Sequence, residues 1–298
     1  MTHTSFSSQR ATTHRAFTLI ELLVAVSIIG LLSSLVLASV NKARDDAKTK
    51  AALQFAAQND RIMGADAVGM WNFEEGSGTT VRDASGWGRD ATLFGGVTFS
   101  TSTYHSALSR YALSFNGTSG RVDTTYGLGI NPTIQPLTIS LWAYPTGTGN
   151  RAVFGSSAAS NQRLYVGIQS GLWDMGIQGS PWGSGLGRVS VEYSKWSHIT
   201  LVANGSGARL YINGRFTFQK SYTSYSLASD IDLGNLRSGT FWWAGRIDDV
   251  RIYARSLTAQ EVKEQYLAGV EKLYANGAID EEEYQARLVA IANERVEE

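Results

Sequence analysis

The stretch Arg209-Leu210-Tyr211-Ile212-Asn213-Gly214-Arg215-Phe216-Thr217-Phe218 contains the clearest local signal for the fold. Its Asn-Gly pair lies between two segments in which apolar residues alternate with other residues. A two-residue type I′ turn needs positive φ at both central positions, and Asn followed by Gly tolerates this conformation best. The stretch therefore predicts a β-hairpin with its turn at Asn213-Gly214.

The same pattern extends outward from this hairpin, from about residue 67 to residue 256. Short alternating runs are separated there by turn residues, mainly Gly, Ser, Asn and Asp. Many short strands at this spacing are typical of a β-sandwich or barrel. Because the chain has no cysteine, we expect one all-β domain over 67–256 that is held together by packing alone. Besides the hairpin, the clearest predicted strands are 70–73, 137–144, 164–168, 197–203 and 245–253.

The order of several motifs in this region resembles that of laminin-G-like, concanavalin A-like jelly-roll domains. The motifs are Gly69-Met70-Trp71-Asn72-Phe73-Glu74-Glu75-Gly76, Ala112-Leu113-Ser114-Phe115-Asn116-Gly117, Leu137-Thr138-Ile139-Ser140-Leu141-Trp142, Trp196-Ser197-His198-Ile199-Thr200-Leu201-Val202, Tyr211-Ile212-Asn213-Gly214 and Gly245-Arg246-Ile247-Asp248-Asp249-Val250-Arg251-Ile252-Tyr253. The resemblance implies a mainly β, jelly-roll sandwich. It implies less about function, because this scaffold carries lectins, adhesins, glycosidases and spacers.

A second signal lies near the N-terminus, where Phe17-Thr18-Leu19-Ile20-Glu21 opens an apolar run that continues to about Val40. The run is long enough to cross a bilayer, which takes about 20 apolar residues. A charge inside such a segment costs roughly 2.5 to 3.5 kcal/mol, so we expect Glu21 to have a partner. Arg10 and Arg15 precede the run, and no acidic residue does, which predicts a cytoplasmic N-terminus and an extracytoplasmic globular domain.

The stretch Arg15-Ala16-Phe17-Thr18-Leu19-Ile20-Glu21-Leu22-Leu23-Val24 resembles the processing site of type IV pilins and type II secretion pseudopilins. The resemblance implies that a prepilin peptidase removes a leader, residues 1–16, by cutting between Ala16 and Phe17, and that the new Phe17 amine is methylated. It also implies that Glu21 pairs with the Phe17 amine of a neighbouring subunit during filament assembly. The chain departs from the family at Ala16, where Gly is usual.

Two simpler interpretations of this segment stay open. An ordinary secretory signal would have a shorter apolar core followed by a small-x-small cut, a pattern that Val36-Leu37-Ala38 matches. A plain single-span anchor would have the same flanking arginines. Neither interpretation accounts for the carboxylate of Glu21, so the pilin-like one is favoured.

The segment after the apolar run is expected to remain helical. Residues 41–63 contain no Pro and no Gly, and they are rich in Ala, Lys, Gln, Arg and Asp. They predict one helix over 17–63, with a membrane span at about 19–40, a stalk, and a C-cap at Gly64. Four residues at four-residue spacing predict the apolar stripe of the stalk: Ala43, Ala47, Ala51 and Phe55.

The C-terminal tail, residues 258–298, also carries helix signals. Thr258-Ala259-Gln260-Glu261 is a capping-box pattern, and Asp280 with Glu283 repeats its spacing. With Asn276-Gly277 as a stop, these signals predict a short helical hairpin. Residues 273–284 weakly resemble a C-terminal oligomerisation module of bacterial proteins. A tail folded back on the sandwich is the alternative.

The composition gives no reason to expect catalysis or nucleic-acid binding. Lys+Arg and Asp+Glu are 26 each, so net charge implies no nucleic-acid partner. Glycosidases on this scaffold use two carboxylates spaced along one strand. Glu74-Glu75 and Asp248-Asp249 are sequence neighbours, so on a strand they would point to opposite faces. His198 lies in a predicted strand, where a structural role is expected, and His105 has no recognisable partner motif. We therefore expect no catalytic residue and no enzyme.

Ligand binding is suggested by the aromatic content, with 8 Trp and 13 Tyr. Trp242, Trp243 and Trp182 are the candidates for stacking on a sugar. In the Trp242-Trp243 pair, one of two adjacent strand residues should point outward, and Trp182 lies in a Gly-rich loop. For any single tryptophan, packing within the sandwich is the favoured alternative. Trp142 and Trp173 are further candidates, and Trp142 is expected to be packed in the interior. No cofactor is expected. Calcium stays open, since some relatives bind it through Asp side chains, but Asp83, Asp123 and Asp230 form no compact loop.

Together these features predict a non-catalytic, pilin-like minor or tip subunit of a type IV pilus or related filament. Its jelly roll would be displayed outside the cytoplasm for adhesion, binding a glycan or a surface protein. The expected partners are the membrane, a prepilin peptidase and other pilin-like subunits. The alternatives are a type II secretion pseudopilin and a membrane-anchored lectin that does not polymerise.

Overall fold

A computed structural model describes residues 18–103, 110–126, 135–157, 163–177, 188–222, 230–236 and 241–293. The chain divides into two compact units, Met1–Lys50 and Ala51–Glu298. Helix α1 (Leu19–Ala65) crosses the boundary between them. The β-strands and the two C-terminal helices all belong to the second unit.

In the first unit, α1 is long and apolar enough to cross a membrane, judged by length and composition. Its large apolar side chains from Leu19 to Val40 are exposed. The hydroxyls of Ser27, Ser34 and Ser39 donate to backbone carbonyls within the helix at 2.8 Å each. These bonds satisfy the polar groups internally, as a helix surrounded by hydrocarbon requires.

In the second unit, the end of α1 packs through a face other than the predicted stripe. Ala56, Asn59 and Met63 are buried, whereas Ala51 and Phe55 of the predicted stripe are exposed. The predicted C-cap is also wrong, because Gly64 lies within the helix, which ends at Ala65. The buried face was missed because it combines an Ala and a Met with the polar residue Asn59, which carries no hydrophobic signal.

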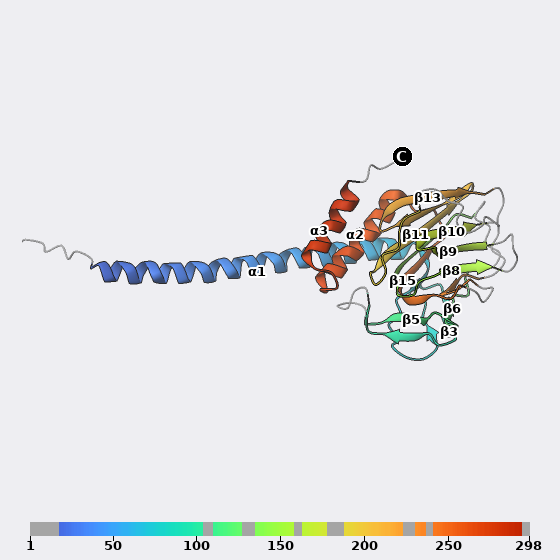
Figure 1. Ribbon diagram of the computed structural model, residues 1–298, viewed down its shortest axis with the longest axis horizontal. Helices are drawn as coiled ribbons and strands as arrows, with labels where there is room; N and C mark the ends of the chain where they lie inside the picture. The colour runs from blue at the N-terminus through green and yellow to red at the C-terminus, as the bar shows by residue number, and fades with distance from the viewer. Residues whose placement is uncertain are drawn as a thin grey trace, which may run out of the picture. The chain divides into compact units, whose positions relative to one another are not determined.

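The second unit contains two antiparallel sheets that form a β-sandwich (Figure 1). The eight-stranded sheet has the order β13-β12-β11-β7-β15-β5-β4, with β1 also paired to β15. The seven-stranded sheet has the order β10-β9-β8-β14-β6-β3-β2. The strands are β1 (Ala67–Trp71), β2 (Thr80–Val81), β3 (Ala91–Phe94), β4 (Thr98–Ser100), β5 (Ala112–Asn116), β6 (Arg121–Asp123), β7 (Leu137–Pro145), β8 (Arg151–Ser157), β9 (Arg163–Gln169), β10 (Leu172–Ile177), β11 (Ser197–Asn204), β12 (Gly207–Ile212), β13 (Arg215–Ser221), β14 (Asp232–Leu233) and β15 (Ala244–Tyr253).

The main core lies between the two sheets and confirms the predicted jelly-roll class. It is built from one face of each strand, including Leu113, Ile139 and Ile252 from the eight-stranded sheet and Val122 and Phe154 from the seven-stranded sheet. All five of these side chains are fully buried. Alternation along each strand directs the remaining residues outward, so the outer faces are where packing partners or ligands can lie.

The predicted hairpin is confirmed in its details. Strands β12 and β13 pair Ile212 with Arg215 across the turn. Asn213 and Gly214 have φ of 53° and 74°, the two positive values that a type I′ turn needs. The strand predicted at 70–73 is wrong at both ends, since β1 covers Ala67–Trp71 and Phe73 has φ of 59°, a conformation that ends an extended segment.

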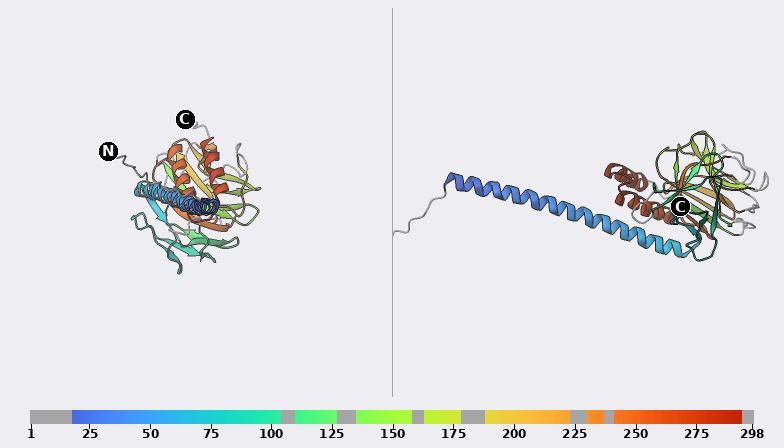
Figure 2. Two further views of the ribbon diagram at one scale, coloured as in Figure 1. Left: turned by 90° about the vertical axis from the view of Figure 1, so that its left-hand side faces the viewer. Right: turned by 90° about the horizontal axis from the view of Figure 1, so that it is seen from below.

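The C-terminal tail forms two helices, α2 (Ala259–Ala275) and α3 (Glu281–Ala292), that lie side by side (Figure 2). The predicted capping box is present: the Thr258 hydroxyl accepts from the Glu261 N–H, and Glu261 accepts from the Thr258 N–H. Tyr266, Val270 and Leu273 of α2 form a second buried cluster with Trp142 of β7. Of the two interpretations of the tail, the structure therefore shows the one in which it folds back on the sandwich.

Candidate functional site

Glu21 lies in the first turn of α1 and has a local partner. The Thr18 backbone N–H and hydroxyl donate to Glu21 Oε2 at 2.9 and 2.8 Å, and the Thr18 hydroxyl accepts from the Glu21 N–H at 3.3 Å. This reciprocal arrangement is a capping box, which fixes the start of a helix. The Thr-x-x-Glu spacing at 18–21 is a capping-box signal in the sequence, in addition to its place in the processing motif.

The two processing residues, Ala16 and Phe17, lie outside the described residues. The first described residue is Thr18, and the helix begins at Leu19. A cut between Ala16 and Phe17 would therefore leave a two-residue N-terminus before the first helical residue. It would also put the Phe17 amine next to the Thr18 cap that holds Glu21.

The candidate tryptophans that the structure describes are not gathered on one surface. Trp243 is fully buried and its ring stacks on that of Trp173, with centroids 6.2 Å apart, so both are core residues. Trp242 is half-buried, and its carbonyl accepts from the Arg151 guanidinium at 2.9 Å. Trp142 is buried as expected, but on the outer face under α2 and not between the sheets. Trp182 lies outside the described residues.

Sequence reasoning missed the tryptophan that is most exposed in the described part of the sandwich. Trp87 is 63% exposed, at the tip of a turn between two glycines with positive φ, Gly86 and Gly88. The Arg89 guanidinium lies 5.1 Å from the Trp87 ring and 4.9 Å from the Tyr126 ring. The signal was available, since Gly-Trp-Gly in a Ser/Gly-rich stretch is typical of a turn with an exposed ring.

The base of this turn is organised by Asp83. Its carboxylate accepts backbone N–H bonds from Met70, Ser85 and Arg89 at 2.9 to 3.0 Å. Partial burial alone would raise the pKa of Asp83, but the bonds from Ser85, Arg89 and Met70 together lower it. Asp83 is thus occupied by the chain itself, and no group of three or more His, Cys, Asp or Glu residues suited to a metal ion occurs in the described ranges. Asp123 and Asp230, the other calcium candidates, belong to no such group.

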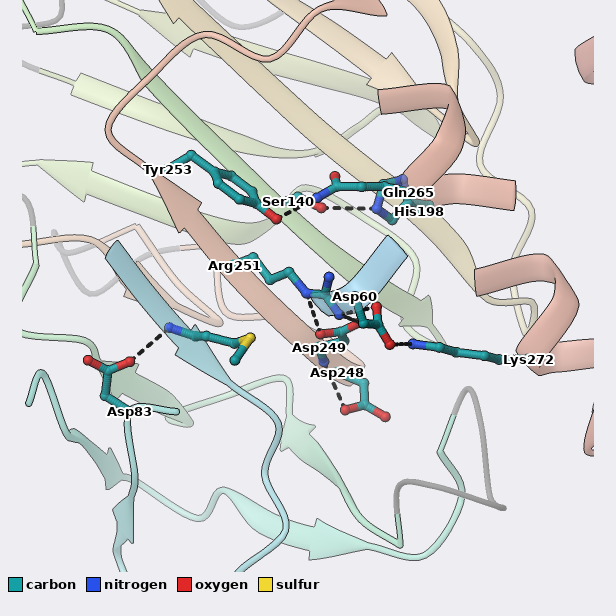
Figure 3. A network of polar contacts seen from close by, with 11 residues as sticks. Asp60, Asp83, Ser140, His198, Asp248, Asp249, Arg251, Tyr253, Gln265 and Lys272 are labelled. Carbon is teal, nitrogen blue, oxygen red and sulfur yellow. Dashed lines mark hydrogen bonds and ion pairs between the residues drawn. The ribbon is translucent and has the colours of Figure 1, made fainter. Parts of the chain in front are cut away.

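The outer face of the eight-stranded sheet is covered by helices and carries a polar junction (Figure 3). Asp60 of α1 accepts from Arg251 of β15 at 2.7 Å and from Lys272 of α2 at 2.5 Å. Arg251 also makes two bonds to Asp249, at 2.8 and 2.9 Å. One carboxylate on α1 therefore bridges a strand of the sandwich and the C-terminal hairpin.

Asp248 and Asp249 correct the expectation that neighbouring carboxylates alternate between faces. The register of β15 with β7 shifts between Asp248 and Arg251, and Asp249 has φ of 45°. Such a bulge interrupts simple alternation and re-aims side chains. It returns Val250 to the core and turns Arg251 outward, toward Asp60 and Asp249.

Next to this junction, His198 is buried under α2. Its Nε2 lies 3.0 Å from the Ser140 hydroxyl, and its ring packs 5.1 Å from that of Trp142. Burial lowers the pKa of His198 to about 3, so the ring is neutral. Gln265 donates to the Tyr253 hydroxyl at 2.5 Å, and burial raises the pKa of Tyr253 to about 12. These groups hold strands and helix together, which is a structural role.

The outer face of the seven-stranded sheet carries a different set of residues. The strand registers place one outward-facing residue from each strand in a single row: Thr80, Thr92, Asp123, Asp232, Gly155, Tyr165 and Gly176. Their neighbours along the strands, such as Val81, Leu93 and Val122, point into the core. The row is thus made of polar, glycine and aromatic residues without an aliphatic side chain.

The row is covered on the β14–β8–β9–β10 side and more open on the β2–β3–β6 side. Tyr165 and Asp232 are fully buried, and Tyr165 packs with Ala152 and Leu236. On the β2–β3–β6 side, Thr80 is exposed, while Thr92 and Asp123 are half-buried. Phe94, two residues after Thr92 and on the same face, is 40% exposed, and the Arg121 guanidinium lies 4.3 Å from its ring. We call Thr80, Thr92, Phe94, Arg121 and Asp123 the open face.

Thr80 of the open face also borders an open hollow of about 810 Å³. The hollow is lined by hydroxyl, carboxylate and guanidinium groups: Glu74, Glu75, Ser77, Gly78, Thr79, Thr80, Arg82 and Asp90. Glu74 and Glu75 both line it, which corrects the expectation of opposite faces, because they lie in a turn and not on a strand. Glu74 accepts from the Arg110 N–H at 2.9 and 3.0 Å, and Glu75 from the Arg82 N–H at 2.8 Å.

Two family models match the sequence. The model of the concanavalin A-like lectin/glucanases superfamily matches residues 115–263, and that of the prokaryotic N-terminal methylation motif matches residues 12–37. No curated protein sequence matches the chain. The two matches confirm the two resemblances that the sequence predicted.

Solved structures share the fold of the sandwich. Domain 4 of AbnA, a GH43 extracellular arabinanase from Geobacillus stearothermophilus, in complex with arabinotriose, is similar with a TM-score of 0.53 at 21% identity, over 67% of this chain and 98% of that one. The receptor binding domain of botulinum neurotoxin C/D mosaic serotype is similar with a TM-score of 0.52 at 14% identity, over 70% of this chain and 52% of that one. The binding domain of botulinum neurotoxin DC in complex with SialylT is similar with a TM-score of 0.51 at 16% identity, over 68% of this chain and 51% of that one. The match thus spans about half of the toxin domains.

Proposed function

Because this chain belongs to the concanavalin A-like lectin/glucanases superfamily and carries the prokaryotic N-terminal methylation motif, we propose that it is a pilin-like subunit displaying a carbohydrate-binding sandwich outside the cytoplasm. The observation that carries the proposal is the presence of both matches in one chain. The motif supplies a route into a filament, and the lectin-like fold supplies a binding module.

The assembly half of the proposal rests on the first turns of α1. Residues 12–37 include the predicted cut between Ala16 and Phe17 as well as Glu21. A prepilin peptidase would cut there and methylate the Phe17 amine. In the filament, Glu21 would exchange its Thr18 bonds for the Phe17 amine of a neighbouring subunit, which removes an isolated charge from hydrocarbon. The partners are then the peptidase, the membrane and other pilin-like subunits.

The display half of the proposal concerns where the sandwich sits and how many copies are used. Arg10 and Arg15 before the span favour a cytoplasmic N-terminus, with the sandwich on the opposite side of the membrane and, after processing, on a cell-surface filament. A sandwich in which the described residues alone form fifteen strands would crowd a homopolymer when carried on one helix. We therefore assign the chain the role of a minor or tip subunit that mediates adhesion to glycans or surface proteins.

Catalysis is not part of the proposal. Glu74 and Glu75 both line the hollow, but each binds a backbone N–H of a neighbouring loop residue. Asp249 is held by Arg251 at the covered outer face. These bonds give all three carboxylates a structural task, and the paired acids of a glycosidase need free access to the scissile bond.

The first test is intact mass with N-terminal peptide mapping of protein recovered from its native membrane. A chain that starts at methylated Phe17 supports the pilin-like subunit, and purified filaments then separate a pilus from a secretion pseudopilus. A chain that keeps residues before Phe17, or starts near Ser39, contradicts processing and leaves a membrane-anchored or secreted lectin.

A further inference from the structure

The carbohydrate-binding proposal leaves open which surface of the sandwich holds the ligand. Much of the outer face of the eight-stranded sheet is buried under α2, α3 and the end of α1, through clusters around Trp142 and Tyr253. On the other sheet, the β14–β8–β9–β10 side is closed, since Tyr165 and Asp232 have no exposed surface. Among the described residues, the open face is an accessible part of the sheets that combines an exposed aromatic ring with hydroxyl and carboxylate groups on neighbouring strands.

The side chains of the open face suit a sugar. Thr80, Thr92 and Asp123 lie side by side on three neighbouring strands, so their Cβ atoms are separated by about 5 Å per strand. Phe94 lies two residues along β3, about 7 Å from Thr92 on the same face. A pyranose or furanose ring needs such a pairing, an aromatic surface beneath its C–H groups and oxygen atoms at its rim to bind hydroxyls.

The charge around this surface restricts the ligand further. Four carboxylates border it, Asp123 on the open face and Glu74, Glu75 and Asp90 in the adjoining hollow, against two guanidinium groups, Arg82 and Arg121. Arg121 lies over the Phe94 ring, 4.3 Å from its centroid. Ionised carboxylates accept hydrogen bonds from hydroxyls but repel a second anion.

From this arrangement, and on the premise of the proposed carbohydrate-binding function, we infer that the chain binds an uncharged glycan over the open face. The face of the Phe94 ring that Arg121 leaves uncovered supports the sugar ring, and Thr92 and Asp123 bind its hydroxyl groups. Asp123 Oδ1 also accepts from the Thr125 N–H at 3.1 Å, and a carboxylate has further lone pairs for a ligand. The glycan extends past Thr80 toward the hollow. Sugars that carry a carboxylate, such as sialic and uronic acids, bind more weakly, because the bordering carboxylates outnumber the two guanidinium groups.

The test uses the full-length protein in detergent on a glycan array, followed by titration calorimetry. The probes are neutral oligosaccharides of arabinose, glucose, galactose and mannose, with galacturonate and sialylated oligosaccharides of equal length. The wild type should bind at least one neutral series. The acidic counterpart should bind about three to ten times more weakly, as expected for like charges near a protein surface.

Matched variants locate the site. Phe94→Ala should weaken neutral-glycan binding about tenfold or more, since loss of an aromatic contact of about 1.4 kcal/mol corresponds to that factor. Phe216→Ala, a phenylalanine of the same 40% exposure on edge strand β13, is the control and should bind as the wild type does. Thr92→Val and Asp123→Asn keep the side-chain shape, so they test the site even where Phe94→Ala lowers stability. Asp123→Asn should also reduce the difference in affinity between neutral and acidic glycans.

The outcomes separate this inference from the proposed function. Binding of neutral glycans that survives Phe94→Ala, Thr92→Val and Asp123→Asn overturns the assignment of the site while leaving carbohydrate binding in place. Equal or tighter binding of the acidic series overturns the ligand class. If the folded wild type binds no glycan of either series, the carbohydrate-binding function itself is contradicted, together with this inference.

Discussion

At the scale of single residues, Glu21 has one partner in the structure and a different partner in the proposed filament. In the isolated chain its carboxylate closes a capping box with Thr18. In the proposed filament it pairs with the Phe17 amine of a neighbour. The capping bonds hold the carboxylate at the first turn, beside the chain terminus that processing would create, so the cap comes first and the pairing with the amine would replace it in the filament.

This distinction gives a testable pair of variants. Glu21→Ala removes both roles and should abolish incorporation into filaments, whereas Thr18→Ala removes mainly the cap, worth about 1 kcal/mol, and should leave most incorporation intact. The measurement is the amount of each variant in purified filaments relative to the membrane fraction. Equal loss of incorporation in both variants would show that assembly requires only the capping box. Normal incorporation of Glu21→Ala would contradict the proposed pairing with the Phe17 amine of a neighbouring subunit.

His198 shows how burial turns a titratable residue into a structural one. His198 lines a small cavity of about 10 Å³, the size of one water molecule. The charged groups that line the same cavity come from three elements: Asp249 and Arg251 of β15, Lys272 of α2 and Asp60 of α1. Burial lowers the pKa of His198 to about 3, whereas an unfolded histidine titrates near 6.5. Between these values the unfolded chain binds one more proton than the folded chain.

The sign of the pH dependence follows from that difference. The stability that neutral His198 contributes is complete above about pH 6.5 and is lost as the pH falls, by about 1.4 kcal/mol per unit down to about pH 3. Between pH 7 and 5, the free energy of unfolding of the wild type should fall by about 2 kcal/mol more than that of His198→Gln. Guanidinium unfolding followed by tryptophan fluorescence measures this, and parallel pH profiles for the two proteins would contradict it.

At the scale of secondary-structure elements, α2 is held against the sandwich by a close approach at one glycine. A Cβ on Gly269 would lie 2.2 Å from the Trp142 ring, so nothing larger than hydrogen fits there. Gly64 in α1 is also helical, but its Cβ would meet only the Met70 side chain at 3.8 Å. The two glycines therefore have opposite consequences for packing although both lower helix propensity.

This contrast predicts opposite effects of one substitution. Gly269→Ala should destabilise the protein by about 1 to 3 kcal/mol, because the buried indole of Trp142 must shift. Gly64→Ala should be neutral or stabilising by up to about 1 kcal/mol, since it only removes conformational freedom from the unfolded chain. Thermal unfolding of both variants measures the effects. If Gly269→Ala unfolds at the same temperature as the wild type, α2 does not pack on Trp142 as described.

At the scale of the whole molecule, the last turns of α1 are joined to the sandwich and to the C-terminal hairpin through Asp60. Its partners are almost fully buried, with side-chain exposures of 8% for Arg251 and 3% for Lys272. Asp66, just past the end of α1, pairs instead with Arg255, and the exposed fractions of these side chains are 56% and 34%. A buried cation that loses its carboxylate is costly, whereas an exposed pair contributes little.

Asp60→Asn should therefore destabilise the second unit by about 2 kcal/mol, after allowance for the partial exposure of Asp60 itself. Asp66→Asn, the matched control, should cost less than about 0.5 kcal/mol. Denaturant unfolding in detergent compares the two. If both variants unfold at the same denaturant concentration, the bridge to Arg251 and Lys272 contributes no more than a surface pair, and the hairpin is held by its apolar cluster alone.

What the sequence by itself determined are the properties that depend on neighbours along the chain. The type I′ turn at Asn213-Gly214, the capping box at Thr258 and the apolar run of α1 are all local, so residue order was enough to predict them. The processing motif and the jelly-roll class followed in the same way from contiguous motifs. The sites depend on long-range register instead. Only the tertiary structure decided that Trp243 is buried between the sheets and that Trp142 lies under α2. It also decided that Glu74 and Glu75 line one hollow and that Thr80, Thr92 and Asp123 align across three short strands. The physical reason is that the contacts that determine these positions join segments far apart in the chain.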